Sequence, residues 1–317
     1  MIDAELWANQ SASPVMLAFV AFLGALWGSF ANVCIYRMPP TDENPKGLSV
    51  VQPGSHCSHC KHPVRWYDNV PMLSYLWLKG KCRDCGTSFS PRYLLVEAAV
   101  AMLFVAVYYY VVAIAYTDTA PTEQLIRSGV LAAFCWLMVV IAFIDLDHRL
   151  ILNKITYPAI PIMYGLGLLL PGATWKTGLI GIVVGYGLVR AIADLFWLVT
   201  RREGMGYGDG KLLAIVGALF GWQGVLVGLF LGSLVGTTLL IPILIAGRIR
   251  AACQPNDKTD EDNSTEPDSV EDCNESEEED IPNWRRVELP FGPFIAIAAV
   301  LFIFIEARLR LHFFFLW

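Results

Sequence analysis

The stretch LMVVIAFID (137–145) decides the fold class, because it ends an apolar run that begins at residue 128 and closes on a carboxylate, Asp145. About 18 apolar residues are enough to cross the hydrocarbon core of a bilayer as a helix. Further runs of this kind lie at residues 14–36, 93–116, 155–171, 178–199 and 288–306. We therefore predict an integral membrane protein.

The apolar stretch 212–247 is too long for one span. As a single helix it would extend about 54 Å, nearly twice the thickness of the hydrocarbon core. The sequence Gly221-Trp222-Gln223-Gly224 offers a turn near its middle, so we expect two short spans here. The predicted fold is an all-α polytopic membrane protein with about eight transmembrane helices.

Composition and charge placement predict how the chain is organised. Of its 317 residues, 55% are hydrophobic and 16% charged, against about 25% charged in an ordinary soluble domain. Lys and Arg gather in 37–92 and in the loops after the third, fifth and seventh predicted spans, and such residues favour the cytoplasmic side. Arg308 and Arg310 do not follow this rule. We predict an external N-terminus (1–13), a first span (14–36), a cytoplasmic module (37–92), spans two to seven (93–249) and a last span with the C-terminus (288–317).

One acidic segment dominates the net charge of -6. Residues 254–283 contain 13 Asp or Glu and one Lys, a composition that cannot build an apolar core. We expect 250–287 to be a disordered cytoplasmic loop, with a regulatory or docking role as the alternative. We expect no nucleic-acid partner, and the oligomeric state stays open.

Two CxxC pairs in the predicted module have the spacing of a structural zinc site. The expected ligands are Cys57, Cys60, Cys82 and Cys85, because four thiolates about 2.3 Å from one ion form the usual closed site. Two disulfides are the alternative, which a cytoplasmic location disfavours. The histidines that lie between or beside these cysteines are possible competing ligands: His56, His59 and His62.

Asp145 and a second carboxylate, Asp209, are the candidate functional residues. Asp209 follows Gly-Met-Gly-Tyr-Gly (204–208) and precedes an apolar run. Ionisable groups at membrane depth are costly and mark functional sites, although two solvated helix ends would also explain them. Gly206 and Gly208 would give the backbone freedom that other residues lack. Two such carboxylates that share one proton could activate a water molecule.

Other charged residues near the predicted membrane have simpler interpretations. We interpret Lys211 and Arg149 as positive anchors at the membrane face, with tuning of the aspartates as the alternative. Arg190 and Asp194 are four residues apart in one predicted helix and should form an ion pair. Glu97, early in the second span, has no predicted role.

Five stretches together resemble one protein family, the bacterial type IV prepilin peptidases, also called prepilin leader peptidase/N-methyltransferases. The resemblance covers about residues 20–306 without the acidic loop, and the five motifs occur in order. They are Gly28-Ser29-Phe30-x-Asn32-Val33-x-x-x-Arg37-x-Pro39, the CxxC pairs around Trp66-Tyr67-Asp68-Asn69-Val70-Pro71-Met72-Leu73-Ser74-Tyr75, Ile144-Asp145-Leu146-Asp147-His148, Glu203-Gly204-Met205-Gly206-Tyr207-Gly208-Asp209-Gly210-Lys211, and Pro290-Phe291-Gly292-Pro293-Phe294.

The resemblance implies a GxGD-type intramembrane aspartic protease with Asp145 and Asp209 as its catalytic pair. Asp147 is the rival for the first position. In the family pattern a proline follows the first aspartate by seven residues, which selects Asp145, although this chain has Leu152 in place of that proline.

The resemblance also implies substrates, a second activity and a location. The expected substrates are type IV prepilins or pseudopilins, cut at the cytoplasmic face of the bacterial inner membrane. The expected second activity is N-methylation of the new terminus with S-adenosylmethionine, for which no binding residues can be named. Two other classes stay open: an ion-coupled transporter, which internal repeats would support, and a non-catalytic assembly subunit, which would tolerate loss of the aspartates.

Overall fold

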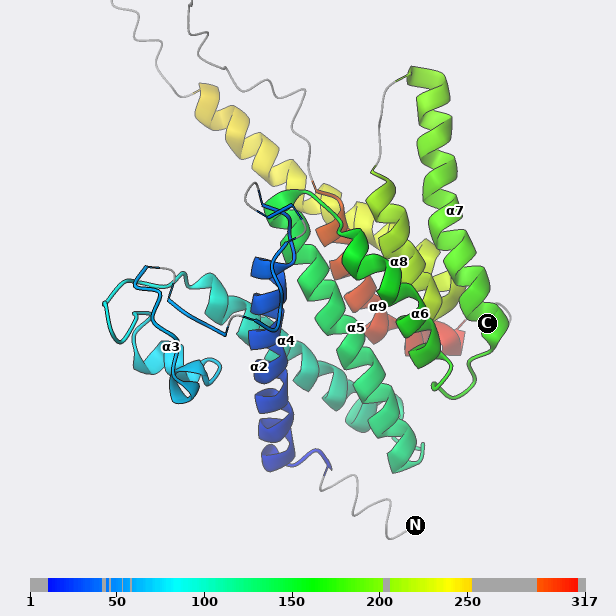
Figure 1. Ribbon diagram of the computed structural model, residues 1–317. Coiled ribbons are helices and arrows are strands. Elements are labelled where there is room, and N and C mark those ends of the chain that lie inside the picture. Colours follow the sequence, from blue (N-terminus) through cyan, green and yellow to red (C-terminus); the bar gives the residue numbers. More distant parts are fainter. Residues whose placement is uncertain are drawn as a thin grey trace, which may run out of the picture. The chain divides into compact units, whose positions relative to one another are not determined.

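The computed structural model describes residues 11–41, 44–45, 47–52, 54–57, 59–201, 206–252 and 290–312. Within these residues every regular element is a helix, and two isolated bridges, His56–Pro63 and Lys81–Ser88, are the strand-like features. Figure 1 shows the helices, which in chain order are α2 (Pro14–Arg37), η1 (Trp66–Asn69), α3 (Leu73–Trp77), α4 (Arg92–Tyr109), η2 (Tyr110–Ala115), α5 (Pro121–His148), α6 (Asn153–Gly167), α7 (Trp175–Thr200), α8 (Tyr207–Ala252) and α9 (Gly292–His312).

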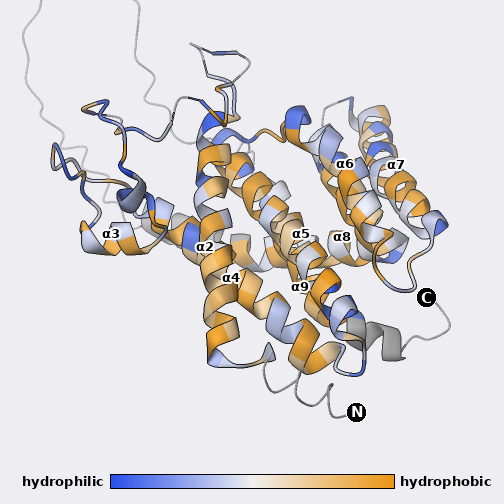
Figure 2. Cartoon of the chain, turned by 60° about the horizontal axis from the view of Figure 1, so that its bottom comes forward, coloured by the Kyte–Doolittle hydropathy of each residue, from blue (hydrophilic) through white to orange (hydrophobic). Residues whose placement is uncertain are grey.

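The helices have the length and composition of membrane spans. In the described part of the chain five segments qualify, namely Pro14–Arg37, Arg92–Ala115, Pro121–His148, Trp175–Thr200 and Tyr207–Leu239. The apolar helix Gly292–Glu306 is shorter, and α6 holds 15 residues with two internal prolines. Figure 2 shows apolar residues along the lengths of these helices. The predicted all-α, polytopic class is confirmed.

Helix α8 carries the break that the sequence predicts. Gly221 has φ 70° and ψ -171°, outside helical values, and helical backbone continues on both sides of it. This φ lies in the region that favours glycine. The stretch 212–247 therefore forms two helical segments joined at Gly221, although the first begins earlier than expected, at Tyr207.

The chain divides into two units. The first consists of Met1–Val235 together with Pro290–Trp317, and the second consists of Gly236–Leu289. Of the second unit the structure describes the end of α8, up to Ala252. The predicted acidic loop lies outside the described residues from position 253 onwards.

Helix α5 lies against α8 and α9 in the core of the first unit. Phe134, Met138 and Ile141 on α5 are buried in one cluster with Leu213 of α8 and Phe302 of α9. The ring of Phe220 on α8 packs edge-on against Phe134 and Phe302, with centroids 5.2 and 5.3 Å apart. This core fixes the ends of the three helices relative to one another.

Glycine contacts hold α7 on α8. A Cβ atom at Gly181 would overlap the backbone carbonyl of Gly217, and one at Gly185 would lie 2.5 Å from the carbonyl oxygen of Leu213. Such direct backbone contact is typical of small residues between membrane helices. Helix α2 approaches α4 in the same way, since a Cβ at Gly28 would lie 2.7 Å from the Cα of Glu97.

Candidate active site

Asp145 lies in the last turn of α5 and is 5% exposed. The backbone N–H of Gly292, the first residue of α9, donates a hydrogen bond to its carboxylate. A Cβ atom at Gly292 would lie 2.5 Å from Oδ2 of Asp145, so this approach requires glycine. The helix ends four residues later, where Arg149 adopts φ 50° and donates its N–H to the Asp145 carbonyl at 2.8 Å. The motif Pro290–Phe294 thus gains a role that its sequence alone did not reveal.

Asp209 lies in the first turn of α8 and is 8% exposed. The sequence placed it in a turn before the helix, but the helix already begins at Tyr207. The backbone N–H of Asp209 donates to the carbonyl of Gly206 at 3.2 Å. The charges of Asp145 and Asp209 interact, so helices α5 and α8 bring together two buried carboxyl groups that are 64 positions apart in the chain.

Ile151 lies between the start of α8 and the start of α9. A Cβ atom at Gly208 would be 2.9 Å from the Cβ of Ile151, and one at Gly292 would be 3.4 Å from its Cδ1. Its side chain therefore packs on the residue before Asp209 and on the residue that bonds to Asp145. No sequence signal indicated Ile151, because its importance comes from contacts between segments that are distant in the chain.

The two glycines of the Gly206-Tyr207-Gly208-Asp209 motif do not have the role expected from the sequence. Neither has a positive φ, so their backbone does not need the conformational freedom of glycine. Gly208 instead provides the space that the side chain of Ile151 occupies, whereas a Cβ at Gly206 would meet no atom closer than 4.0 Å.

Asp147, the rival of Asp145, is engaged elsewhere. Its carboxylate accepts hydrogen bonds from both terminal nitrogens of Arg92 on α4, at 2.7 and 2.5 Å. It is exposed, whereas Asp145 is buried. The geometry therefore favours Asp145 as the partner of Asp209.

Charged residues around the pair have structural partners. Lys211 donates to the side-chain oxygen of Asn153 at the start of α6, and its ammonium lies 5.1 Å from the ring centroid of Tyr157. The predicted ion pair between Arg190 and Asp194 is confirmed, at 2.9 Å. The Arg190 guanidinium also lies 4.5 Å from the ring centroid of Tyr207, which connects α7 to the start of α8.

Leu152 stands where the family resemblance leads us to expect a proline, and its backbone has a conformation that proline could also adopt. Leu152 is the residue before α6 and has φ -70° and ψ 121°. Proline fixes φ near about -65°, so the chain has a proline-like conformation here without the ring. Helix α6 starts directly afterwards, at Asn153.

The four predicted zinc ligands come together through two equivalent turns. The N–H of Cys57 donates to the His62 carbonyl at 2.9 Å, and the N–H of Cys82 donates to the Thr87 carbonyl at 2.8 Å. In each turn the residue after the second cysteine has a left-handed backbone, with φ 57° at Lys61 and 71° at Gly86. The repeated CxxC spacing therefore folds into one local structure used twice.

The cysteine sulfurs form a set that fits a metal ion. Those of Cys57, Cys60, Cys82 and Cys85 lie within 4.8 Å of one another, and all four are free cysteines. Cys57 and Cys85 are 3.8 Å apart, close to the separation of roughly 3.8 Å that a tetrahedron with 2.3 Å zinc–sulfur bonds requires. Hydrogen bonds from the side chain and backbone of Thr87 lower the pKa of Cys85 to about 6, which favours the thiolate that metals bind. His56, His59 and His62 do not belong to the cluster.

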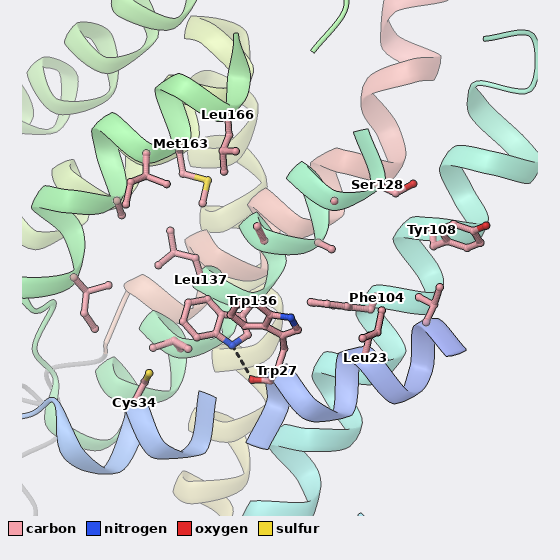
Figure 3. A pocket seen from close by; sticks show the side chains of 18 of the residues that line it. Leu23, Trp27, Cys34, Phe104, Tyr108, Ser128, Trp136, Leu137, Met163 and Leu166 are labelled. Carbon is pink, nitrogen blue, oxygen red and sulfur yellow. Dashed lines mark hydrogen bonds between the residues drawn. The ribbon is translucent and has the colours of Figure 1, made fainter. Parts of the chain in front are cut away.

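A large apolar cavity lies on the other side of α5 and does not reach the aspartates. Figure 3 shows its lining by Trp27, Trp136 and Met163, and its volume is about 690 Å³. Trp136, whose indole donates to the Trp27 carbonyl at 2.9 Å, precedes Asp145 by nine residues, or two and a half helical turns. The two side chains therefore point in opposite directions from α5.

Comparisons with known proteins agree with this arrangement. Residues 22–111 match the family model of the bacterial peptidase A24 N-terminal domain, and residues 132–241 match that of the type IV leader peptidase family. A prepilin leader peptidase/N-methyltransferase from Aeromonas hydrophila is 38% identical over 259 residues, covering 73% of this chain and 83% of the relative. A protein of the same name from Myxococcus xanthus is 31% identical over 319 residues, covering 90% and 89%. No solved structure matched the chain.

Proposed function

Because the chain belongs to the prepilin leader peptidase/N-methyltransferase family, we propose that Asp145 and Asp209 are the aspartate pair of its peptidase reaction. The protein removes the leader of type IV prepilins or pseudopilins and methylates the new N-terminal amine. The burial of both carboxyl groups and their mutual interaction are the observations that support the assignment. The transporter and assembly-subunit alternatives are not favoured.

The two carboxyl groups have different surroundings, which suggests different roles. The Gly292 N–H at the start of α9 donates to Asp145, and such a bond favours an ionised carboxylate. We assign Asp145 as the base that takes a proton from water and Asp209 as the protonated member. The resulting hydroxide attacks the scissile carbonyl while Asp209 donates its proton to the carbonyl oxygen. The tetrahedral intermediate then collapses: the C–N bond breaks, Asp145 gives its proton to the leaving amine, and Asp209 takes back the proton of the hydroxyl group. Gly208, which packs on Ile151, and Lys211, which bonds to Asn153, support the helix start that carries Asp209.

The second reaction uses S-adenosylmethionine as methyl donor. The new N-terminal amine attacks the methyl group, the sulfonium is converted to a neutral thioether, and the amine loses a proton. The four cysteines would hold a structural Zn²⁺ ion, which would join the two CxxC turns. The basic residues of segment 37–92 support a cytoplasmic location of this module in the bacterial inner membrane, with cleavage at the same face.

Substitution of the aspartates tests the peptidase assignment. In a purified preparation with a prepilin, Asp145→Asn and Asp209→Asn should each lower the cleavage rate by at least about 100-fold, because each removes one partner in proton transfer. Asp147→Asn is the matched control and should cleave at a rate near wild type. Intact mass spectrometry follows loss of the leader and, with the methyl donor present, gain of one methyl group. Substantial cleavage by either Asn variant would remove that residue from the pair.

The metal assignment has its own test. Replacing Cys57 and Cys60 with Ser removes two of the four sulfurs, so the purified protein should lose its zinc, measured by elemental analysis. Cys34→Ser and Cys135→Ser are controls, because both cysteines are buried in the helical core and should leave the zinc content unchanged. An unaltered zinc content in the double variant would refute the site.

A further inference from the structure

The short helix α3 exposes its apolar side. Leu76 and Trp77 follow Leu73 by three and four residues, about one turn of this five-residue helix. Leu73, Leu76 and Trp77 are 62%, 61% and 84% exposed. We call these three residues the apolar face of α3. Trp66 on the neighbouring η1 is 83% exposed. Contiguous exposed apolar residues in a folded unit mark a contact surface.

The other side of α3 fixes this orientation. Tyr75 packs its ring on Gly80, where a Cβ would lie 2.8 Å from the ring, and its hydroxyl donates to the Phe89 carbonyl at 3.4 Å. The Ser74 hydroxyl donates to the Val70 carbonyl at 2.7 Å. The polar residues are therefore used inside the module, while the apolar face points away from it.

Contacts with the membrane helices fix the depth of α3. The N–H of Met72, directly before α3, donates to the Glu97 carboxylate on α4 at 2.8 Å. Glu97 is buried against Gly28 of α2. Nine residues, or about 13 Å of helix, follow Gly28 before α2 ends at Arg37. Helix α3 therefore starts beside the spanning segments rather than beyond their ends, as Figure 1 also shows.

The backbone at Met72 shows how firmly α3 is held at this depth. Met72 has φ 60° and ψ -48°, and the N–H of Leu73 donates to the Pro71 carbonyl at 2.6 Å, which defines a γ-turn with positive φ. This turn is strained and persists only where surrounding contacts impose it. The hydrogen bond to Glu97 supplies such a contact, and a further hydrogen bond joins Glu97 to Ser29 of α2.

Cationic residues follow the apolar face. Lys79 and Lys81 are both exposed and lie two and four residues after Trp77. Tryptophan with nearby lysine is the combination that occupies the boundary between lipid headgroups and acyl chains, where lysine extends towards the anionic phosphates.

We propose that the apolar face of α3 inserts into the headgroup region of the bilayer, with Lys79 and Lys81 contacting anionic phospholipid headgroups. The cysteine module is then attached to the membrane surface through α3 and does not project freely into the surrounding water. The partner is the lipid surface itself.

Site-specific photo-crosslinking in the full-length protein tests this placement. The photoreactive residue p-benzoylphenylalanine replaces Leu76 in one variant, Trp77 in a second and Lys61 in a control, since Lys61 is exposed in the first cysteine turn. Each variant is reconstituted in bilayer discs of phosphatidylcholine with phosphatidylglycerol and irradiated. Intact mass spectrometry should show lipid adducts at positions 76 and 77, at least about tenfold above position 61. Only variants that keep the wild-type zinc content are compared.

Four results would overturn all or part of the proposal. Absence of lipid adducts at both positions 76 and 77 would show that the apolar face does not enter the bilayer. Yields equal to that at position 61 would indicate unspecific labelling. In cell membranes, crosslinks at positions 76 and 77 to a protein in place of lipid would identify a protein-docking surface. Lys79→Glu with Lys81→Glu should lower the adduct yield at position 76 several-fold in discs that contain phosphatidylglycerol, and an unchanged yield would overturn the headgroup contact.

Discussion

At the scale of single residues, two buried carboxyl groups, Asp145 and Asp209, depend on neighbours from distant parts of the chain. Asp145 and Asp209 stand out in the sequence because each ends or begins an apolar run, where a carboxylate is costly. Gly292 was part of a recognisable motif, but the sequence did not show its role. No feature of the sequence pointed to Ile151. Both act through contacts between segments that are more than 50 positions apart in the chain, which periodicity and spacing do not report.

The glycines before Asp209 should respond unequally to alanine. Gly208→Ala should lower the cleavage rate by about 100-fold, because its Cβ would overlap Ile151 and displace the adjacent carboxylate. Gly206→Ala should cleave near the wild-type rate, since its Cβ would meet open space. Cleavage rates at saturating prepilin, with matched protein levels in the membrane, measure the difference.

A second substitution identifies the cause of the loss. Gly208→Ala combined with Ile151→Gly removes the three atoms nearest to the new Cβ, so the double variant should regain at least about tenfold in rate over the single one. Equal rates for Gly206→Ala and Gly208→Ala, or no recovery in the double variant, would contradict the packing explanation.

At the scale of helices, hydropathy located the spans and tertiary contacts set their ends. The predicted third span began at residue 128, but α5 starts at Pro121. Arg127 interrupted the apolar run in the sequence, yet it is buried with its guanidinium 4.0 Å from the ring centroid of Tyr116. A charge satisfied in this way does not end a helix. The break at Gly221 was predictable, because length and a glycine-flanked turn both required it.

The glycine contact between α7 and α8 predicts a difference within one helix. Gly181→Val should reduce the free energy of unfolding by about 1–3 kcal/mol, because the larger side chain would overlap the backbone of Gly217. Gly187→Val, six residues later on α7, meets no atom within 4 Å and should be near neutral. Thermal unfolding of both variants in one detergent compares them. Similar unfolding temperatures for the two would show that α7 does not depend on this contact.

At the scale of the whole molecule, the aspartate site needs only the first unit. Asp145, Asp209 and Gly292 all belong to Met1–Val235 with Pro290–Trp317. The sequence predicts only that 250–287 is a loop outside the helical core, because 254–283 has too few apolar residues to join one.

Deleting residues 256–280 should therefore leave cleavage within about twofold of wild type. Twelve residues of 253–289 would remain between α8 and Pro290. Fully extended, twelve residues reach roughly 40 Å. The cleavage assay with a prepilin, at equal amounts of purified protein, tests this. A large loss would assign the acidic segment a direct part in the reaction.

The hydrogen bond from Gly292 to Asp145 has a meaning for biosynthesis. Helix α9 is the last described helix to leave the ribosome, and Asp145 acquires its backbone donor only when that helix is inserted. A nascent chain that already contains both aspartates still lacks the Gly292 N–H that bonds to Asp145. Under the proposed mechanism, the growing chain should therefore become a protease only once α9 is in place, and a product truncated before Gly292 should leave the proteins around it uncut.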